Sequence, residues 1–173
     1  METNSTATPE TAAISFVLSP EALLNHWQGH RRLTRRVIEA FPEEQFYNFS
    51  IGGMRTFAGL TMEMIGLAAP GVNGIATGNW TFDEPKLDYS TEAPATRKEV
   101  LELWDLTTDI INNLWAQIPE GRFQENDVAY GMYEGTIYDL TLYLIDNEIH
   151  HRGQGYVYLR ALGIEPPAFW DRN

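Results

Sequence analysis

The sequence contains no cysteine. This absence excludes disulfides, thiolate metal ligands and a cysteine nucleophile, so any thiol chemistry must use a sulfur from another molecule. Basic residues are also scarce, with 12 Lys and Arg against 24 Asp and Glu and a formal net charge of -12. A strongly acidic chain is repelled by phosphate backbones and anionic lipid surfaces. We therefore expect neither nucleic acid nor a membrane to be the main partner.

Long apolar runs are missing as well. No run approaches the roughly 20 residues that span a bilayer, and the opening "METNSTATPETAAIS" has neither the basic start nor the apolar core of a signal peptide. We expect residues 1–18 to form a flexible tail and the protein to be cytoplasmic, which the lack of cysteine permits. Hydrophobic residues make up 43% of the 173 residues, an ordinary globular composition. The sequence thus predicts one domain over residues 19–173.

Two amphipathic helices are predicted in the first half of the chain. The first begins at "SPEALL", where Ser19 suits the N-cap and Pro20 the first helical position, and it should end near Phe41. The second follows "SIGG" (50–53), and we expect "APGVNG" (69–74) to stop it. A long connection, rich in Gly, Pro and Asp, should then run to about residue 95.

Two more helices are predicted in the second half. Thr96 and Glu99 fit a capping box at the start of the third, which should end before Pro119. The segment "RFQENDVAYGMYEG" leaves room for short strands, and the last helix should run from about Thr136 to Leu162. Together these elements predict an all-α four-helix bundle with a long connection between helices 2 and 3. The order of the helices stays open, and the long connection permits a crossover.

The last helix carries an unusual group of polar residues in "LIDNEIHHRGQ". An α-helix turns about 100° per residue, so with Leu144 at the centre of the apolar stripe His151 lies about 20° away. Glu148 lies about 40° to one side and Asn147 about 60° to the other, whereas His150 points away. We therefore expect Asn147, Glu148 and His151 to face the interior of the bundle.

The inward polar residues have two interpretations. Glu148 and His151 have the spacing of bundle carboxylate metal sites, and Asn147 lies one turn before His151. Alternatively, they form a hydrogen-bonded structural cluster in which an arginine pairs with Glu148. Glu63 of the second helix, between Met62 and Met64, either points to solvent or supplies an inward ligand or base. On the first helix, polar residues border the same interior: His30, Arg31 and Thr34.

Three segments resemble one known family. "HRGQ" (151–154) with the following "YLRALGIEPP", the earlier "GGMRTFAGLTMEMIG" and the opening "HWQGHRRLTRRVIEAFPEEQF" are similar to the last, second and first helices of the DinB/YfiT-like family of metal-dependent enzymes. The resemblance covers about residues 20 to 170. It implies a four-helix bundle, commonly dimeric, with a divalent metal between the second and last helices. The family holds this metal with three histidines, and here His151 is retained while Glu63 and Asn147 occupy the other two positions.

The resemblance implies a metal set of Glu63, Asn147 and His151, with Glu148 and His151 as catalytic residues. Such a set offers harder ligands and a lower metal affinity than three histidines. The candidate ions are Zn, Ni, Mn and Fe. The alternative is a site that has lost its metal and kept only a polar pocket.

The resemblance also implies an activity, because characterised relatives use a low-molecular-weight thiol. The expected function is a divalent-metal-dependent enzyme, specifically a thiol transferase. The alternatives are a non-catalytic small-molecule-binding or dimerising bundle with a degenerate metal site, and a metal-dependent hydrolase that uses Glu148 or Glu63 as base. We expect a homodimer and a small-molecule ligand, and we expect loss of His151 to be more damaging than loss of His150.

Overall fold

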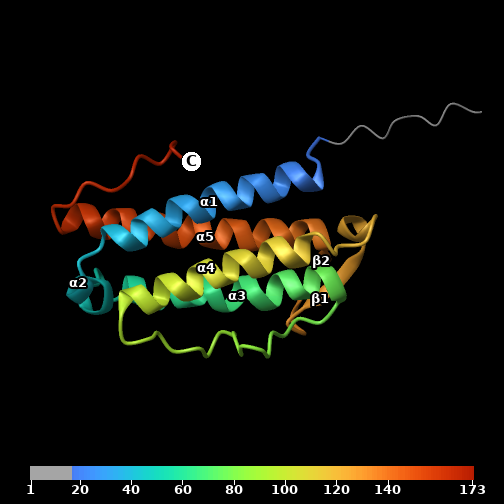
Figure 1. Ribbon diagram of the computed structural model, residues 1–173, viewed down its shortest axis with the longest axis horizontal. Helices are drawn as coiled ribbons and strands as arrows, with labels where there is room; N and C mark the ends of the chain where they lie inside the picture. Colours follow the sequence, from blue (N-terminus) through green and yellow to red (C-terminus); the bar gives the residue numbers. More distant parts are fainter. Residues whose placement is uncertain (1–16) are drawn as a thin grey trace, which may run out of the picture.

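A computed structural model of the protein describes residues 17–173, so residues 1–16 of the expected flexible tail lie outside the described residues. The described chain is an all-α bundle, as predicted, with one small β-hairpin (Figure 1). The long helices are α1 (Pro20–Ala40), α3 (Phe57–Thr77), α4 (Arg97–Trp115) and α5 (Ile137–Ala161). The shorter elements are α2 (Glu43–Asn48), the 3-10 turn η1 (Arg122–Gln124), β1 (Asn126–Ala129) and β2 (Tyr133–Thr136).

The bundle is wound with a crossover. Helix α3 packs against α4 and α5, and α1 packs against the same two helices, so α1 and α3 lie on opposite corners. Figure 1 shows that α3 and α4 run in one direction while α1 and α5 run in the other. The connection of residues 78–96 returns along the length of the bundle between α3 and α4. This arrangement settles the helix order that the sequence left open.

Local capping explains where the helices begin and end. The Ser19 hydroxyl accepts a hydrogen bond from a backbone N–H of the first turn of α1, and Thr96 and Glu99 form the predicted reciprocal capping box. Gly163 has a φ of 76° and ends α5 by donating its N–H to the Arg160 carbonyl. The predicted ends of the first and last helices are therefore confirmed to within a residue or two.

The predicted end of the second helix is wrong. Helix α3 continues through "APGVNG" to Thr77 and ends at Gly78, whose φ is 80°. Pro70 lies inside the helix, where it lacks an N–H to donate. The third helix also differs slightly, because it ends at Trp115 and a turn precedes Pro119.

The glycines of α3 allow the connection to lie directly on the helix. A Cβ at Gly66 would lie 2.3 Å from the carbonyl oxygen of Asp88, and one at Gly74 would lie 2.1 Å from the ring of Trp80. These glycines look like a helix stop in the sequence, but in the structure they allow α3 to pack closely against residues 78–96. Gly74 and Gly66 fix the position of a segment that forms one wall of the site described below.

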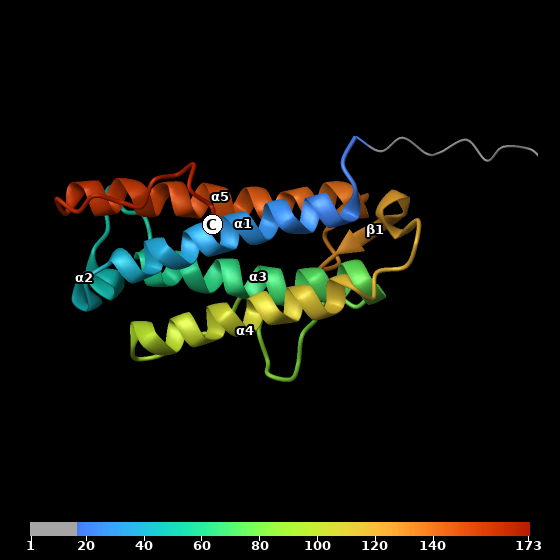
Figure 2. The ribbon, with the colours of Figure 1, turned by 45° about the horizontal axis from the view of Figure 1, so that its top comes forward.

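The final segment of the chain packs against α1. The segment after α5 turns back along α1 (Figure 2), where the Arg32 Nε atom donates to the Arg172 carbonyl at 2.9 Å and Arg36 pairs with Asp171 at 2.9 Å. Within the described residues, none of the helices combines the length and the apolar character needed to cross a bilayer.

Candidate functional site

The polar residues predicted on the second and last helices meet where α3 packs against α5. The Oε1 atom of Glu63 lies 2.9 Å from the Nε2 atom of His151 and accepts a hydrogen bond from the Asn147 amide at 3.2 Å. The three positions that the family resemblance assigns to one site therefore do lie together across these helices. We call Glu63, Asn147 and His151, with the side chains that hold them, the Glu63 cluster.

Each polar atom at the centre of the Glu63 cluster has a partner. Arg55, just before α3, forms an ion pair with the Oε2 atom of Glu63. The Nδ1 atom of His151 lies 2.8 Å from the Oε1 atom of Gln154, and the Gln154 amide contacts the sulfur of Met54 at 3.8 Å. Both carboxylate oxygens and both imidazole nitrogens are thus engaged, which fixes the orientation of the two side chains.

The Glu63 carboxyl is ionised at neutral pH. Burial by itself would raise its pKa, but hydrogen bonds from His151, Arg55 and Asn147 outweigh burial and hold the pKa below its ordinary value. The side chain of Glu63 is 13% exposed and that of His151 is 7% exposed. The cluster therefore presents a carboxylate that is largely buried and still partly open to solvent.

The donor set of the Glu63 cluster does not fit a tightly held divalent ion. It offers one carboxylate and one imidazole, and the Asn147 amide turns its nitrogen toward Glu63. The guanidinium of Arg55 already neutralises the carboxylate and would repel a cation at the same place. Across residues 17–173, no group of three or more His, Cys, Asp or Glu side chains is placed to hold a metal ion.

The structure places Glu148 away from the Glu63 cluster. It turns toward α1 and pairs with Arg31 of that helix, and both side chains are 1% exposed. Arg31 also donates to the Trp104 carbonyl at 3.0 Å and to the Thr108 hydroxyl at 2.9 Å. Burial raises the pKa of Glu148, while the charge of Arg31 lowers it. Glu148, which we expected to be catalytic, thus forms the alternative that the sequence allowed, a buried ion pair with an arginine.

A second polar group lies at the interface of α1 and α5. The Nε2 atoms of His30 and His26 are 3.2 Å apart, and Arg152 donates to the backbone oxygen of His30 at 3.3 Å. Burial and the positive charges of Arg152, Arg172 and His26 lower the pKa of His30 to about 3. His30 is therefore neutral in the folded protein. His150, in contrast, is exposed as expected.

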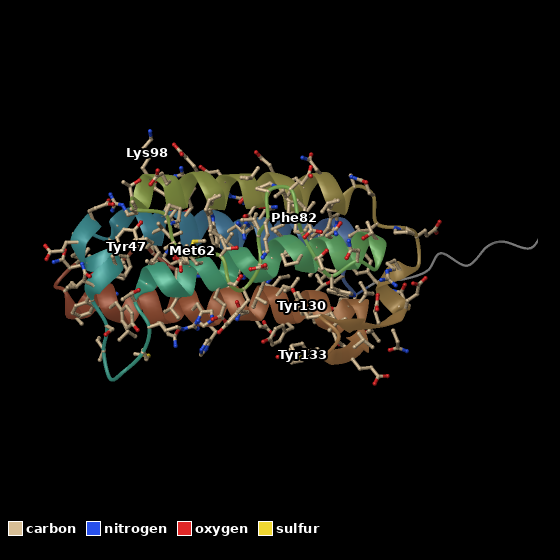
Figure 3. The ribbon with its side chains drawn as sticks, turned by 90° about the horizontal axis from the view of Figure 1, so that it is seen from below. Tyr47, Met62, Phe82, Lys98, Tyr130 and Tyr133 are labelled. Carbon is tan, nitrogen blue, oxygen red and sulfur yellow. The ribbon has the colours of Figure 1, made fainter. Side chains whose placement is uncertain are left out.

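A cavity of about 540 Å³ opens beside Glu63, and sequence reasoning did not find it. It lies between α3 and α5 and is covered by the connection of residues 78–96 and by the β-hairpin. Figure 3 shows this face, with Phe82 on one side of α3 and Tyr130 and Tyr133 on the other. We call it the aromatic pocket; its lining is Glu63, Gly66, Leu67, Pro70, Trp80, Thr81, Phe82, Asp83, Asp88, Tyr89, Tyr130, Met132, Tyr133 and Tyr143.

The size and lining of the aromatic pocket are those of a small-molecule site. Such sites measure about 300–1,000 Å³ and combine apolar and aromatic walls with a few placed polar groups. The sequence signal was the concentration of aromatic residues in "NWTFDEPKLDY" (79–89) and "YGMY" (130–133), segments that sequence reasoning treated only as connections. Glu63 is the residue that belongs to both the pocket and the polar cluster.

Comparisons with known proteins agree with this fold. A sequence profile described as the DinB family matches residues 15–172. The crystal structure of a DinB-like protein from Bacillus subtilis is similar with a TM-score of 0.68 at 19% identity, covering 86% of this chain and 96% of that one. A DinB-like protein from Bacillus cereus gives a TM-score of 0.68 at 20% identity, covering 87% and 97%. No curated protein matches the chain. At these identities the two structures show a shared fold alone.

Proposed function

The chain belongs to the DinB family, and we propose that it binds a small organic molecule in the aromatic pocket, against the carboxylate of Glu63. The observation that carries the proposal is the cavity itself, which is about 540 Å³ in volume and has a single ionised, oriented carboxylate at its α3 wall. A ligand in this pocket makes apolar contacts with the rings and one directional polar contact with Glu63.

The Glu63 cluster serves this role as a positioning network. His151 and Asn147 hold one carboxylate oxygen and Arg55 holds the other, so the carboxylate does not turn when a ligand enters. A preorganised polar group loses less conformational entropy when a ligand binds than a mobile one does. This chain's residues therefore support recognition of a ligand without requiring a metal ion.

A metal-dependent thiol transferase or hydrolase is the second candidate. One observation favours it: a carboxylate, an imidazole and an amide converge where the family resemblance locates a metal. The ion pair between Arg55 and Glu63 counts against it, because a divalent ion would have to displace the guanidinium. Its candidate ions are Zn, Ni, Mn and Fe, and its candidate cosubstrate is a low-molecular-weight thiol.

The test uses 1-aminoanthracene, a neutral dye whose fluorescence rises in apolar surroundings. We expect saturable binding of one dye per chain, weakened several-fold by Tyr143→Leu in the aromatic pocket. The matched control is Tyr138→Leu, because Tyr138 lines a different cavity near the start of α1. No saturable binding, or equal loss in both variants, overturns the proposal.

Elemental analysis of protein purified without chelators separates the two candidates. We expect far less than one transition-metal ion per chain. A stoichiometric ion that is lost in His151→Ala but kept in His150→Ala would overturn the binding proposal in favour of the metal-dependent enzyme.

A further inference from the structure

The charges that line the aromatic pocket all have one sign. Three acidic residues, Glu63, Asp83 and Asp88, are among the residues that line it, and no lysine, arginine or histidine is among them. The asymmetry is local as well as global, since the whole chain has a formal net charge of -12. An anionic ligand would be repelled from this pocket, and a cation would be attracted to it.

The three carboxylates differ in how far they are already neutralised. Glu63 has Arg55 as a partner, and Asp88 has Lys86 at 3.1 Å, although the Lys86 side chain is 69% exposed. Asp83 accepts a hydrogen bond from the Thr81 hydroxyl at 3.2 Å, and within residues 17–173 no basic side chain pairs with it. Asp83 is therefore the carboxylate with the most uncompensated charge at the pocket.

Aromatic rings make up much of the remaining wall. Tyr133 and Tyr143 stack with their centroids 6.2 Å apart, and Trp80 meets Tyr130 edge-on at 5.6 Å. The Tyr130 hydroxyl donates to the Leu67 carbonyl at 2.8 Å, which fixes that ring against α3. Ring faces attract cations through their quadrupole, and the attraction is largest when the cation is shielded from water.

We propose that the aromatic pocket selects an organic cation, a substituted amine or ammonium group whose apolar part lies among the aromatic rings and whose charge lies toward Asp83 and Glu63. A bare metal ion fits less well, because within residues 17–173 no three acidic or histidine side chains are grouped closely enough to hold one. A neutral ligand would use the rings but leave the carboxylates unused. This inference rests on the proposed function, because it names the class of molecule that the same pocket binds.

The test compares three probes with one carbon skeleton: 2-phenylethylamine, 2-phenylethanol and phenylacetate, which are cationic, neutral and anionic at pH 7.5. Each displaces 1-aminoanthracene from the intact chain at low salt. We expect the amine to bind about tenfold more tightly than the alcohol, in the range of a partly exposed cation–π contact aided by a carboxylate. Phenylacetate should bind most weakly. Salt should reduce the advantage of the amine over the alcohol.

A pair of charge variants shows whether the preference is local. Asp83→Asn removes one charge at the pocket with little change in shape, and we expect it to weaken amine binding roughly threefold while alcohol binding is unchanged. Asp109→Asn removes the same charge from the exposed face of α4, and it should change neither. An equal loss in both variants would mean that net charge alone attracts the amine and would overturn a local site.

The outcomes distinguish the ligand class from the proposed function. If the dye binds in the aromatic pocket but all three probes displace it equally, the pocket binds small molecules and the cation preference is wrong. If phenylacetate binds most tightly, the charge argument is reversed. If the dye does not bind at all, the proposed function is wrong, and so is the proposed class of ligand.

Discussion

Glu63 and His151 are 88 residues apart in the chain, and yet their Oε1 and Nε2 atoms lie 2.9 Å apart across α3 and α5. The contact joins the two helices that form the aromatic pocket at the level of its polar wall. Because Arg55 neutralises the same carboxylate, the pair belongs to a closed network rather than to an open metal site. The predictions below separate what this network contributes to stability, to metal affinity and to ligand binding.

The two adjacent histidines of α5 should differ in their effect on stability. His151→Ala removes the partner of the Gln154 amide oxygen and one of the three partners of Glu63, so we expect the free energy of unfolding to fall by about 1–3 kcal/mol. His150→Ala alters an exposed side chain and should change it by less than about 0.5 kcal/mol. Urea unfolding followed by circular dichroism measures both. Equal effects would show that the Glu63 cluster adds nothing to the fold.

A metal site should become stronger when its missing donor is supplied. Asn147→His combined with Arg55→Gln places a second imidazole one turn from His151 and removes the competing guanidinium. We expect cobalt(II) to bind this variant at least about tenfold more tightly than the parent, with visible d–d absorption.

The control for that experiment is Asp146→His with Arg55→Gln, which adds the imidazole to an exposed position of α5. It should gain much less affinity for cobalt(II). A parent protein that already binds cobalt as tightly as the engineered site would contradict our interpretation of Arg55.

The buried ion pair should matter to folding and not to the pocket. Glu148→Ala leaves the Arg31 charge buried without its partner, and we expect a loss of about 3–5 kcal/mol in unfolding free energy. Glu102→Ala, on the exposed face of α4, is the control and should be nearly neutral. Calorimetry gives the stabilities, and any folded Glu148→Gln protein should bind 1-aminoanthracene like the parent. Loss of dye binding in that variant would show that Glu148 contributes to the functional site.

Stability should fall as the pH drops below about 6.5 because His30 must stay neutral in the fold. Its folded-state pKa is about 3, below the 6.5 of an unperturbed histidine, so between these values the unfolded chain binds the extra proton. The slope is at most about 1.4 kcal/mol per pH unit. The positive neighbours His26, Arg152 and Arg172 act in the same direction.

The measurement is urea unfolding from pH 7 to 4.5, a window above most of the carboxyl titrations. His30→Gln should flatten the pH dependence, whereas His150→Gln, at an exposed position, should not. A parent protein whose stability is constant over this window would show that His30 does not stay neutral.

The expected homodimer is still a prediction. Large hydrophobic side chains are exposed on several elements, and those on the hairpin, on α5 and on the final segment are Val128, Met132, Tyr133, Tyr138, Tyr143, Val157, Phe169 and Trp170. We expect sedimentation at micromolar concentration to give twice the chain mass of 19.7 kDa. A species of 19.7 kDa alone would refute the dimer.

Much of the bundle was predictable because its signals are local. Ser19, the pair Thr96 and Glu99, and Gly163 act within a few residues of themselves, and the 100° phase of α5 separated His151 from His150 correctly. The glycines of α3 misled the prediction because they are explained by contacts with Asp88 and Trp80. These partners lie outside the helix, and no residue next to the glycines indicates them.

The candidate site was only half predictable for the same reason. Helix phase placed His151 inward and left two orientations open for Glu63, and which neighbour each polar residue meets depends on the helix order. With α1 beside α5, Glu148 meets Arg31, while Asn147 meets Glu63 on the other side. The aromatic pocket escaped notice because its wall is built from two connections that have no periodic pattern, and its shape exists only after residues 78–96 fold over α3.

The pairing of Arg31 with Glu148 also sets an order of events during synthesis, since 117 residues separate the two. Helices α1, α3 and α4 emerge from the ribosome before α5, and until then the Arg31 guanidinium has no carboxylate to meet it in the interior. The nascent three-helix intermediate should therefore keep its central groove hydrated and sensitive to protease. Ribosome-stalled chains ending before α5 test this, and protease resistance that appears before residue 148 has left the exit tunnel would contradict it.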